Sequence, residues 1–254
     1  MTTGRTQLQS EHKLLHAARA DAVRMPELRL PKGFFVEYAR SNLRSFPWRH
    51  HGISSFELLV AELLLIQTKA EDVAKIWPEL MKRYPSPARV AAARMQSLRA
   101  LLRPLGLQNQ RACALRAVSR TIMAEFGGRV PKELSELLSL PYVGLYVACA
   151  VTSFGHGRRV PIVDANILRV FSRVTGSDFG RDLRRSHQVW VAAWSILPAR
   201  NHARHNYGVL DFAAQVCTAR APLCASCGLR AGCAYARDRA QNGNVDRKRP
   251  ACNT

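Results

Sequence analysis

Apolar residues recur at helical spacing along most of this chain, and no segment alternates apolar and polar residues convincingly. Glycine and proline separate the apolar segments at Gly106, Gly127-Gly128 and Pro131, as residues that end helices do. We therefore expect strands to be scarce, and the sequence predicts an all-α protein. The expected helices cover residues around 34–49, 56–67, 88–103, 109–126 and 132–139.

One expected helix carries an acid among leucines. Residues 56–67 read FELLVAELLLIQ, and Glu62 interrupts the apolar run. Carboxylates are almost never buried without a partner, and a carboxyl group kept from water holds its proton, which suits a general acid. The alternative is an exposed helix face on which Glu57 and Glu62 are both solvated. The leucines at helical spacing around Glu62 argue against that alternative, but the sequence leaves both open.

The charge of the chain points to a polyanionic partner. Lysine and arginine number 38 against 18 acidic residues, so the 254 residues have a formal net charge of +20. Such an excess favours nucleic acid. An anionic membrane surface is the alternative, but no basic amphipathic helix with an aromatic stripe stands out, and no apolar stretch is long enough to span a bilayer. With 47% hydrophobic residues, the chain can still bury a core.

Four cysteines form a tight run near the C-terminus: Cys217, Cys224, Cys227 and Cys233. The spacing is C-x6-C-x2-C-x5-C, and thiolates suit zinc and iron–sulfur clusters. Disulfides are disfavoured because the chain starts without a secretion signal, and we expect an intracellular, cytoplasmic protein located with DNA. Zinc sites usually have two matched CxxC pairs, whereas this run has one, which favours the cluster. We expect Cys113 and Cys149 to be small core residues, and Cys252 to be free in a polar tail.

A turn between two expected helices offers a phosphate site. Leu140-Pro141-Tyr142-Val143-Gly144 precedes an apolar helix, whose first backbone N–H groups have no partner inside the helix. Such a turn can grip a DNA backbone without reading its sequence, although many helix–turn–helix corners look alike. Asp164 follows eighteen residues after Tyr146. We expect it to be a helix N-cap, a role that leaves it able to face a substrate.

These features together resemble the helix-hairpin-helix (HhH-GPD) DNA glycosylases of the endonuclease III superfamily. The cysteine spacing is similar to the iron–sulfur loop of that family, residues 140–144 to its hairpin, and residues 163–166 (VDAN) to its catalytic aspartate motif. The resemblance covers residues from about 34 to 235. It implies a [4Fe-4S] cluster held by the four cysteines of the run. It also implies a monomer that acts on double-stranded DNA containing a mismatched or damaged base.

The resemblance further implies how the chain is divided. Members of the family have two helical domains, with the active site in the cleft between them. Residues 53–164 would form a six-helix domain with the hairpin, and residues 31–52 and 165–234 together the domain of the cluster. Residues 1–30 would be a basic N-terminal arm, as a short helix or a mobile segment, and residues 235–254 a basic tail.

One position sets the reaction that the resemblance implies. Bifunctional members carry a lysine nucleophile where this chain has Tyr146, and without that amine no Schiff base can form with the sugar. We therefore expect a monofunctional glycosylase. Asp164 would stay ionised beside an oxocarbenium-like sugar, while Glu62 protonates the departing base or positions water. Tyr146 would line the sugar side of the pocket.

Further family positions concern contact with DNA. Gln67 would fill the gap left by the flipped nucleotide. Tyr142, Val143 and Gly144 would lie against the DNA backbone. The family hairpin reads L-P-G-V-G, however, and Tyr142 replaces its first glycine, so a left-handed backbone there would cost about 1–2 kcal/mol. Trp48 belongs to a family motif near the active site, and it is also suited to be a buried aromatic anchor.

The expected substrate is T or U opposite G. Residues 106–112 and 127–131 are similar to the thymine-removing branch, and the chain ends shortly after its cysteines, without room for the domain that reads 8-oxoguanine in adenine enzymes. Glu62 and Gln67 are shared with that adenine branch, so removal of A opposite 8-oxoguanine or G is the alternative. A non-catalytic iron–sulfur DNA-binding protein is the alternative of another class, against which Glu62 and Asp164 argue.

Overall fold

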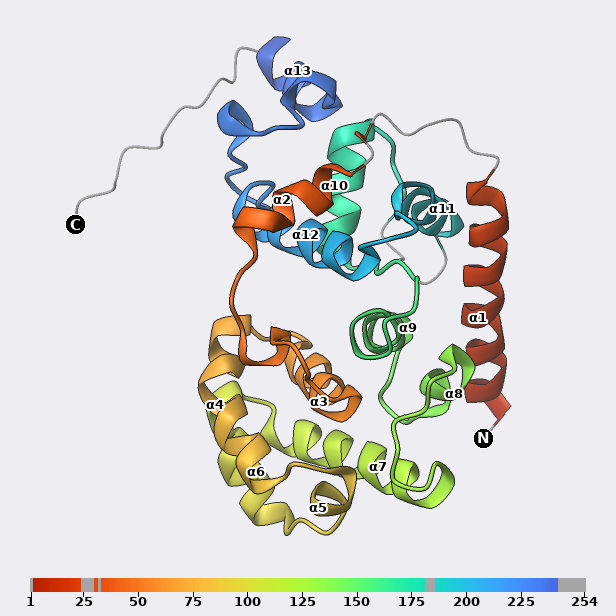
Figure 1. The fold of residues 1–254 in the computed structure, drawn as a ribbon, viewed down its shortest axis with the longest axis vertical. Coiled ribbons are helices and arrows are strands. Elements are labelled where there is room, and N and C mark those ends of the chain that lie inside the picture. The colour runs from red at the N-terminus through yellow and green to blue at the C-terminus, as the bar shows by residue number, and fades with distance from the viewer. Residues whose placement is uncertain (1, 24–29, 32, 181–185, 242–254) are drawn as a thin grey trace, which may run out of the picture. The chain divides into compact units, whose positions relative to one another are not determined.

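The computed structural model describes residues 2–23, 30–31, 33–180 and 186–241 (Figure 1). Within these residues every regular element is a helix, which confirms the all-α class. No helix in this part of the chain is both long and apolar enough to cross a membrane. Part of the expected N-terminal arm, most of the expected basic tail and Cys252 lie outside the described residues.

The chain divides into two compact units. The first unit comprises Met1–Ala17, Arg44–Ile162 and Ala199–Ala203, and the second Ala18–Leu43, Val163–Pro198 and Arg204–Thr254. Asp164 belongs to the second of these units. The α-helices are α1 (Thr2–Ala22), α2 (Phe34–Asn42), α3 (Ser55–Leu65), α4 (Ala70–Arg83), α5 (Pro87–Ala91), α6 (Met95–Leu102), α7 (Gln108–Glu125), α8 (Leu134–Ser139), α9 (Leu145–Ala150), α10 (Ala165–Thr175), α11 (His187–Ile196), α12 (His202–Gln215) and α13 (Ala234–Gln241). The other helical turns are η1 (Pro47–Arg49), η2 (Arg103–Leu105), η3 (Val151–Gly155), η4 (Cys224–Ser226) and η5 (Arg230–Gly232).

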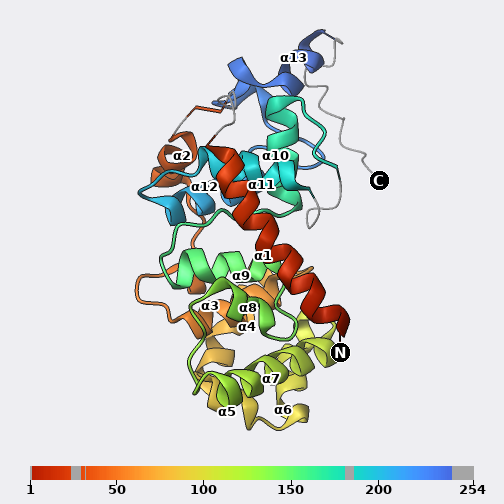
Figure 2. The ribbon, with the colours of Figure 1, turned by 90° about the vertical axis from the view of Figure 1, so that its right-hand side faces the viewer.

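Helix α3 is buried in the first unit, where it packs against α4, α7 and α9 (Figures 1 and 2). All its side chains from Leu58 to Leu64 are buried, as expected for a helix that is apolar on every face. The helix begins with a capping box. Ser54 Oγ accepts the N–H of Glu57 at 3.2 Å, and Glu57 Oε2 accepts the N–H of Ser54 at 2.9 Å. This cap fixes where the acid-bearing helix starts.

Helix boundaries differ from the prediction where extended residues interrupt the chain. The helix expected over residues 34–49 is shorter, because Leu43 is extended and Pro47 begins a separate 3₁₀ turn. The helix expected over residues 88–103 is two helices, α5 and α6, with Arg94 extended between them. Helix α4 was not among the expected elements, although its buried side chains recur at helical spacing.

An aromatic cluster of α2 and α12 lies in the core of the second unit. The Phe212 ring is edge-on to three rings of α2, at centroid distances of 5.5, 5.6 and 5.3 Å for Phe34, Phe35 and Tyr38. Gly208 allows α12 to approach α2 closely, because a Cβ at this position would stand 2.1 Å from the Phe35 carbonyl oxygen. The two helices therefore meet backbone against backbone at this point.

The N-terminal residues form helix α1, one of the two forms expected for the basic arm. Leu15 is buried in the first unit. In the second unit, the Arg19 guanidinium lies 5.3 Å from the Trp194 ring centroid, and His187 Nε2 lies 3.3 Å from Asp21 Oδ2. The C-terminal half of α1 is therefore held by packing at Leu15 and by cation–π and polar contacts at Arg19 and Asp21.

Candidate active site and cysteine loop

Glu62 lies on the buried helix α3. Its side chain is 3% exposed. Of the two interpretations that the sequence left open, a buried and a solvated Glu62, the structure therefore supports the buried one. Glu57, the other acid of this helix, is used in the capping box. Of the two acids of α3, Glu62 is therefore the one whose side chain is kept from solvent.

Helix α3 ends in a turn that exposes Gln67. The backbone of Gln67 has φ +54°, in the left-handed region, and its side chain is exposed. The guanidinium of Arg111, on α7, donates to the carbonyl oxygens of Leu64 and Ile66 at this end of the helix, at 2.9 and 3.1 Å. Sequence reasoning missed Arg111. The one feature of the sequence that could have pointed to Arg111 is its place in residues 106–112, which we noted only because this segment is similar to the family.

The hairpin between α8 and α9 keeps a left-handed residue at its tip, although that residue is a tyrosine. Tyr142 has φ +63° and is 60% exposed. Leu140 and Val143 on either side are buried, and the N–H of Val143 donates to the Leu140 carbonyl at 3.3 Å. Gly144 then caps α9 with an extended backbone. Buried flanking residues therefore hold the tight turn and leave the tyrosine ring in solvent.

Tyr146 is half-buried in the first turn of α9, which continues into the π-helical turn η3. Cys149, one turn further, is fully buried as expected, and burial raises the pKa of its thiol. The expectation for Cys113 was wrong. This cysteine is exposed, because α7 buries Ala112 and Leu115 and so turns residue 113 toward solvent.

Asp164 is the N-cap of α10, as the sequence predicted. Its Oδ1 accepts the N–H of Ile167 at 2.7 Å, and its Oδ2 accepts a hydrogen bond from Asn166 Nδ2 at 2.7 Å. Arg169 donates to Asn166 Oδ1 at 2.9 Å and to the Cys217 carbonyl at 3.0 Å. A chain of hydrogen bonds in the second unit therefore runs from the Asp164 carboxylate to the cysteine run.

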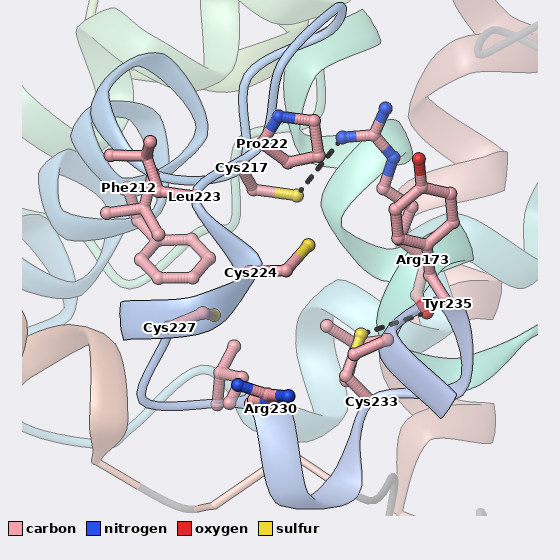
Figure 3. Close-up of a pocket in the computed structure, with 14 residues that line it drawn as sticks. Arg173, Phe212, Cys217, Pro222, Leu223, Cys224, Cys227, Arg230, Cys233 and Tyr235 are labelled. Atoms are coloured by element: carbon pink, nitrogen blue, oxygen red, sulfur yellow. Dashed lines mark hydrogen bonds between the residues drawn. The ribbon is translucent and has the colours of Figure 1, made fainter. Parts of the chain in front are cut away.

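Four cysteines line one pocket of the second unit: Cys217, Cys224, Cys227 and Cys233 (Figure 3). The pocket contains about 350 Å³ of empty space, including the part open to solvent. Arg173 fixes the start of this loop, because it donates to the Thr218 and Ala219 carbonyls at 2.7 and 2.9 Å. Its Nη1 also lies 3.5 Å from Cys217 Sγ. The described cysteines form no disulfide, and among the described side chains no group of three or more His, Cys, Asp or Glu residues could hold one metal ion.

Trp48 is a buried aromatic anchor in the first unit. It is 2% exposed and stacks on Phe46, with ring centroids 5.1 Å apart. The ring of Trp77 lies 6.4 Å away. The structure therefore places this side chain in the core, with little surface left for DNA.

Comparison with known proteins gives the family. A family model described as "HhH-GPD superfamily base excision DNA repair protein" matches residues 60–191. The thymine-DNA glycosylase of Aeropyrum pernix is 38% identical over 197 residues, which are 76% of this chain and 87% of that protein. The adenine DNA glycosylase of Mycobacterium tuberculosis is 36% identical over 196 residues, which are 76% of this chain and 63% of that protein.

Solved structures share the fold. A thermostable thymine-DNA glycosylase superposes with a TM-score of 0.76 at 31% identity, over 80% of this chain and 94% of that one. An endonuclease III in a non-covalent DNA complex has a TM-score of 0.70 at 24% identity, over 82% and 95%. From the family match, these relatives and the helical fold with its hairpin, this chain belongs to the HhH-GPD superfamily of base excision DNA repair proteins.

Proposed function

We propose that this protein is a monofunctional DNA glycosylase that hydrolyses the N-glycosidic bond of a thymine or uracil opposite guanine. The 38% identity to the thymine-DNA glycosylase of A. pernix and to the thymine/uracil-DNA glycosylase of Pyrobaculum aerophilum supports this substrate. The presence of a tyrosine at position 146 is the observation that supports a monofunctional reaction. Two residues after Gly144 caps α9, the chain has a phenol and no amine, so no Schiff base with the sugar can form.

Adenine is the alternative substrate. The adenine DNA glycosylase of M. tuberculosis is 36% identical to this chain, close to the identity of the thymine enzymes. A buried acid on α3 and the acid that caps α10 would serve either base equally. The choice between the two substrates therefore depends on the base pocket and requires a direct measurement.

In the proposed reaction, two carboxyl groups have different roles. Glu62 protonates the departing base or positions water, while the Asp164 carboxylate stabilises positive charge that develops on the sugar. Hydrogen bonds from Ile167 N–H and Asn166 Nδ2 hold the Asp164 carboxylate in one orientation. The glycosidic bond breaks, water adds to the sugar carbon, and the free base leaves an abasic site in an intact strand.

Binding to DNA would use backbone, charge and an inserted side chain. The hairpin of Tyr142, Val143 and Gly144 stands before α9, where the first backbone N–H groups of the helix and its dipole favour a phosphate. The net charge of +20 adds attraction that is independent of sequence. The target nucleotide must leave the stack to be cleaved, and the exposed Gln67 would occupy the gap.

We also propose that the pocket of four cysteines holds a [4Fe-4S] cluster. The donor set is four thiols without a disulfide among the described cysteines, which suits iron–sulfur ligation. The run contains one CxxC pair, Cys224 and Cys227, whereas zinc sites usually have two matched pairs, which favours a cluster over one zinc ion. The cluster would hold the loop from Cys217 to Cys233 in one shape. A brown protein that absorbs near ~400 nm and contains iron and sulfide would support it, whereas stoichiometric zinc would refute it.

Single-turnover excision on a panel of duplexes tests the substrate and the reaction together. The panel contains G·T, G·U, A·8-oxoguanine and A·G, each assayed with and without alkali. We expect the T and U strands to break only after alkali, because the product is an abasic site. Breakage without alkali would contradict the monofunctional reaction, and excision of A alone would give the adenine alternative. Tight binding without excision of any base would favour a non-catalytic DNA-binding protein.

A further inference from the structure

We propose that Arg111 is a positioning residue that locks two surface turns of the first unit together, and that base excision depends on this lock. The turns are residues 65–68, after α3, and residues 105–107, before α7; we call them the paired turns. The inference rests on the proposed function in one respect, since the side chain of Gln67 in the first turn is the one that would enter the DNA. Arg111 itself is 6% exposed and touches no substrate.

The guanidinium of Arg111 makes hydrogen bonds to both of the paired turns. On one side, its Nη1 donates to the Leu64 carbonyl at 2.9 Å, and its Nη2 to the Ile66 carbonyl at 3.1 Å and to Thr68 Oγ1. On the other side, its Nε donates to the Gly106 carbonyl at 3.0 Å. One buried cation thus serves the carbonyls at the end of α3, which lack partners within the helix, together with the turn that starts α7.

Each of the paired turns has a non-glycine residue in the left-handed region. Gln67 has φ +54° and Leu107 has φ +50°, and both side chains are exposed. Non-glycine residues keep this conformation only where the surroundings fix it, and such residues gather at functional sites. In this protein one group, the guanidinium of Arg111, is hydrogen-bonded to both turns. Arg111 therefore couples the backbone that carries Gln67 to the backbone that carries the exposed Leu107.

A lysine cannot replace this lock. A guanidinium is a planar fork with five donors, and Arg111 uses it to reach four acceptors in different directions. An ammonium group is a point charge on a flexible stem and cannot satisfy both turns at once. Arg111→Lys therefore keeps the charge and most of the packing while it releases one of the paired turns from the other.

The test compares Arg111→Ala and Arg111→Lys with Val118→Ala. Val118 is also buried on α7, but its side chain has no hydrogen-bonding atom and so cannot bond to either of the paired turns; its truncation is therefore a control for loss of stability in this unit. We expect both Arg111 variants to lose about 100-fold in single-turnover excision, as misplaced groups commonly do, with affinity for undamaged DNA retained. Millimolar guanidinium should restore much of the rate of Arg111→Ala and leave Val118→Ala unchanged.

Coupling to Gln67 separates positioning from general damage. If Arg111 acts through the paired turns, Arg111→Ala should cost much less in a Gln67→Ala background than in the wild type. Fully additive losses, or equal rates for Arg111→Ala and Val118→Ala, would overturn the proposal.

Amide hydrogen exchange provides a readout that does not need the reaction. Residues 65–68 and 105–107 should exchange faster in both Arg111 variants than in Val118→Ala. Unchanged exchange would refute the lock even if excision were impaired. If the wild-type protein excised no base, the proposed function would fail, and exchange would still decide whether Arg111 holds the paired turns.

Discussion

Asp164 combines a structural and a proposed chemical role that one substitution can separate. Asparagine caps a helix about as well as aspartate but has no charge, so Asp164→Asn should keep α10 intact. We expect single-turnover excision to fall by at least about 100-fold, because the developing positive charge on the sugar loses its counter-charge. Affinity for mismatched DNA should be retained. Asp164→Ala, the control, should lose excision and also about 1 kcal/mol of stability with the cap; wild-type excision by Asp164→Asn would contradict the assignment.

We expect the tyrosine at position 142 to lower the stability of the protein through the backbone conformation that it must adopt. Its φ of +63° is one that glycine adopts freely and that costs other residues about 1–2 kcal/mol. The ring is 60% exposed, so little packing is lost on truncation. Tyr142→Gly should therefore raise the free energy of unfolding, measured with denaturant, by about 0.5–1 kcal/mol after the entropy of the more flexible unfolded chain is subtracted. Tyr142→Ala should show no such gain, and equal effects of the two variants would refute backbone strain as the cause.

At the scale of elements, the approach of α12 to α2 depends on a missing side chain. Alanine favours a helix over glycine by about 1 kcal/mol, so Gly208→Ala would be stabilising if space allowed it. A Cβ at 2.1 Å from the Phe35 carbonyl oxygen must instead push the two helices apart. We expect a net loss of about 1–3 kcal/mol in thermal or denaturant unfolding. Gly144→Ala, where nothing lies within 4 Å of the new atom, should change stability by less than half as much.

The same pair of helices makes stability depend on pH through His205. This residue of α12 lies edge-on to Phe35 at 5.4 Å, and burial lowers its pKa to about 4 from the usual 6.5. As pH falls from 6.5 to 4, the unfolded chain gains a proton at His205 and the folded protein does not, so stability is lost. A shift of this size corresponds to about 3 kcal/mol across that window.

Denaturant unfolding at several pH values between 7 and 4 checks this expectation. His205→Gln removes the titration, so the difference in unfolding free energy between wild type and variant should shrink as pH falls. The carboxylates contribute to both proteins alike and cancel in the comparison. A difference that stays constant with pH would show that His205 titrates normally in the folded protein.

For the whole molecule, charge should dominate binding to undamaged DNA. With a net charge of +20, the protein should release many counterions from the phosphates it contacts. We expect the affinity for an undamaged duplex to fall by at least about 10-fold between 50 and 200 mM salt, and the affinity for a mismatched duplex to fall with a similar slope. Titration by fluorescence anisotropy at four salt concentrations measures both slopes. Binding independent of salt would contradict a role for the charge.

The sequence alone was sufficient for features that arise within a few consecutive residues. The helix-capping role of Asp164 follows from its own side chain and the N–H three residues later. The cysteine spacing and the turn at 140–144 are local patterns too, and the helical periodicity predicted the all-α class. These features together with the resemblance were enough to identify the family.

Tertiary structure decided what depends on residues far apart in the chain. The burial of Glu62 and the exposure of Cys113 depend on which face of a helix meets another helix. The break between α5 and α6 has no glycine or proline to announce it. Arg111 acts on the Leu64 carbonyl, 47 residues before it. Periodicity shows that a helix has an apolar face but does not name its neighbour, and a buried cation is stable only when the folded chain brings its acceptors to it.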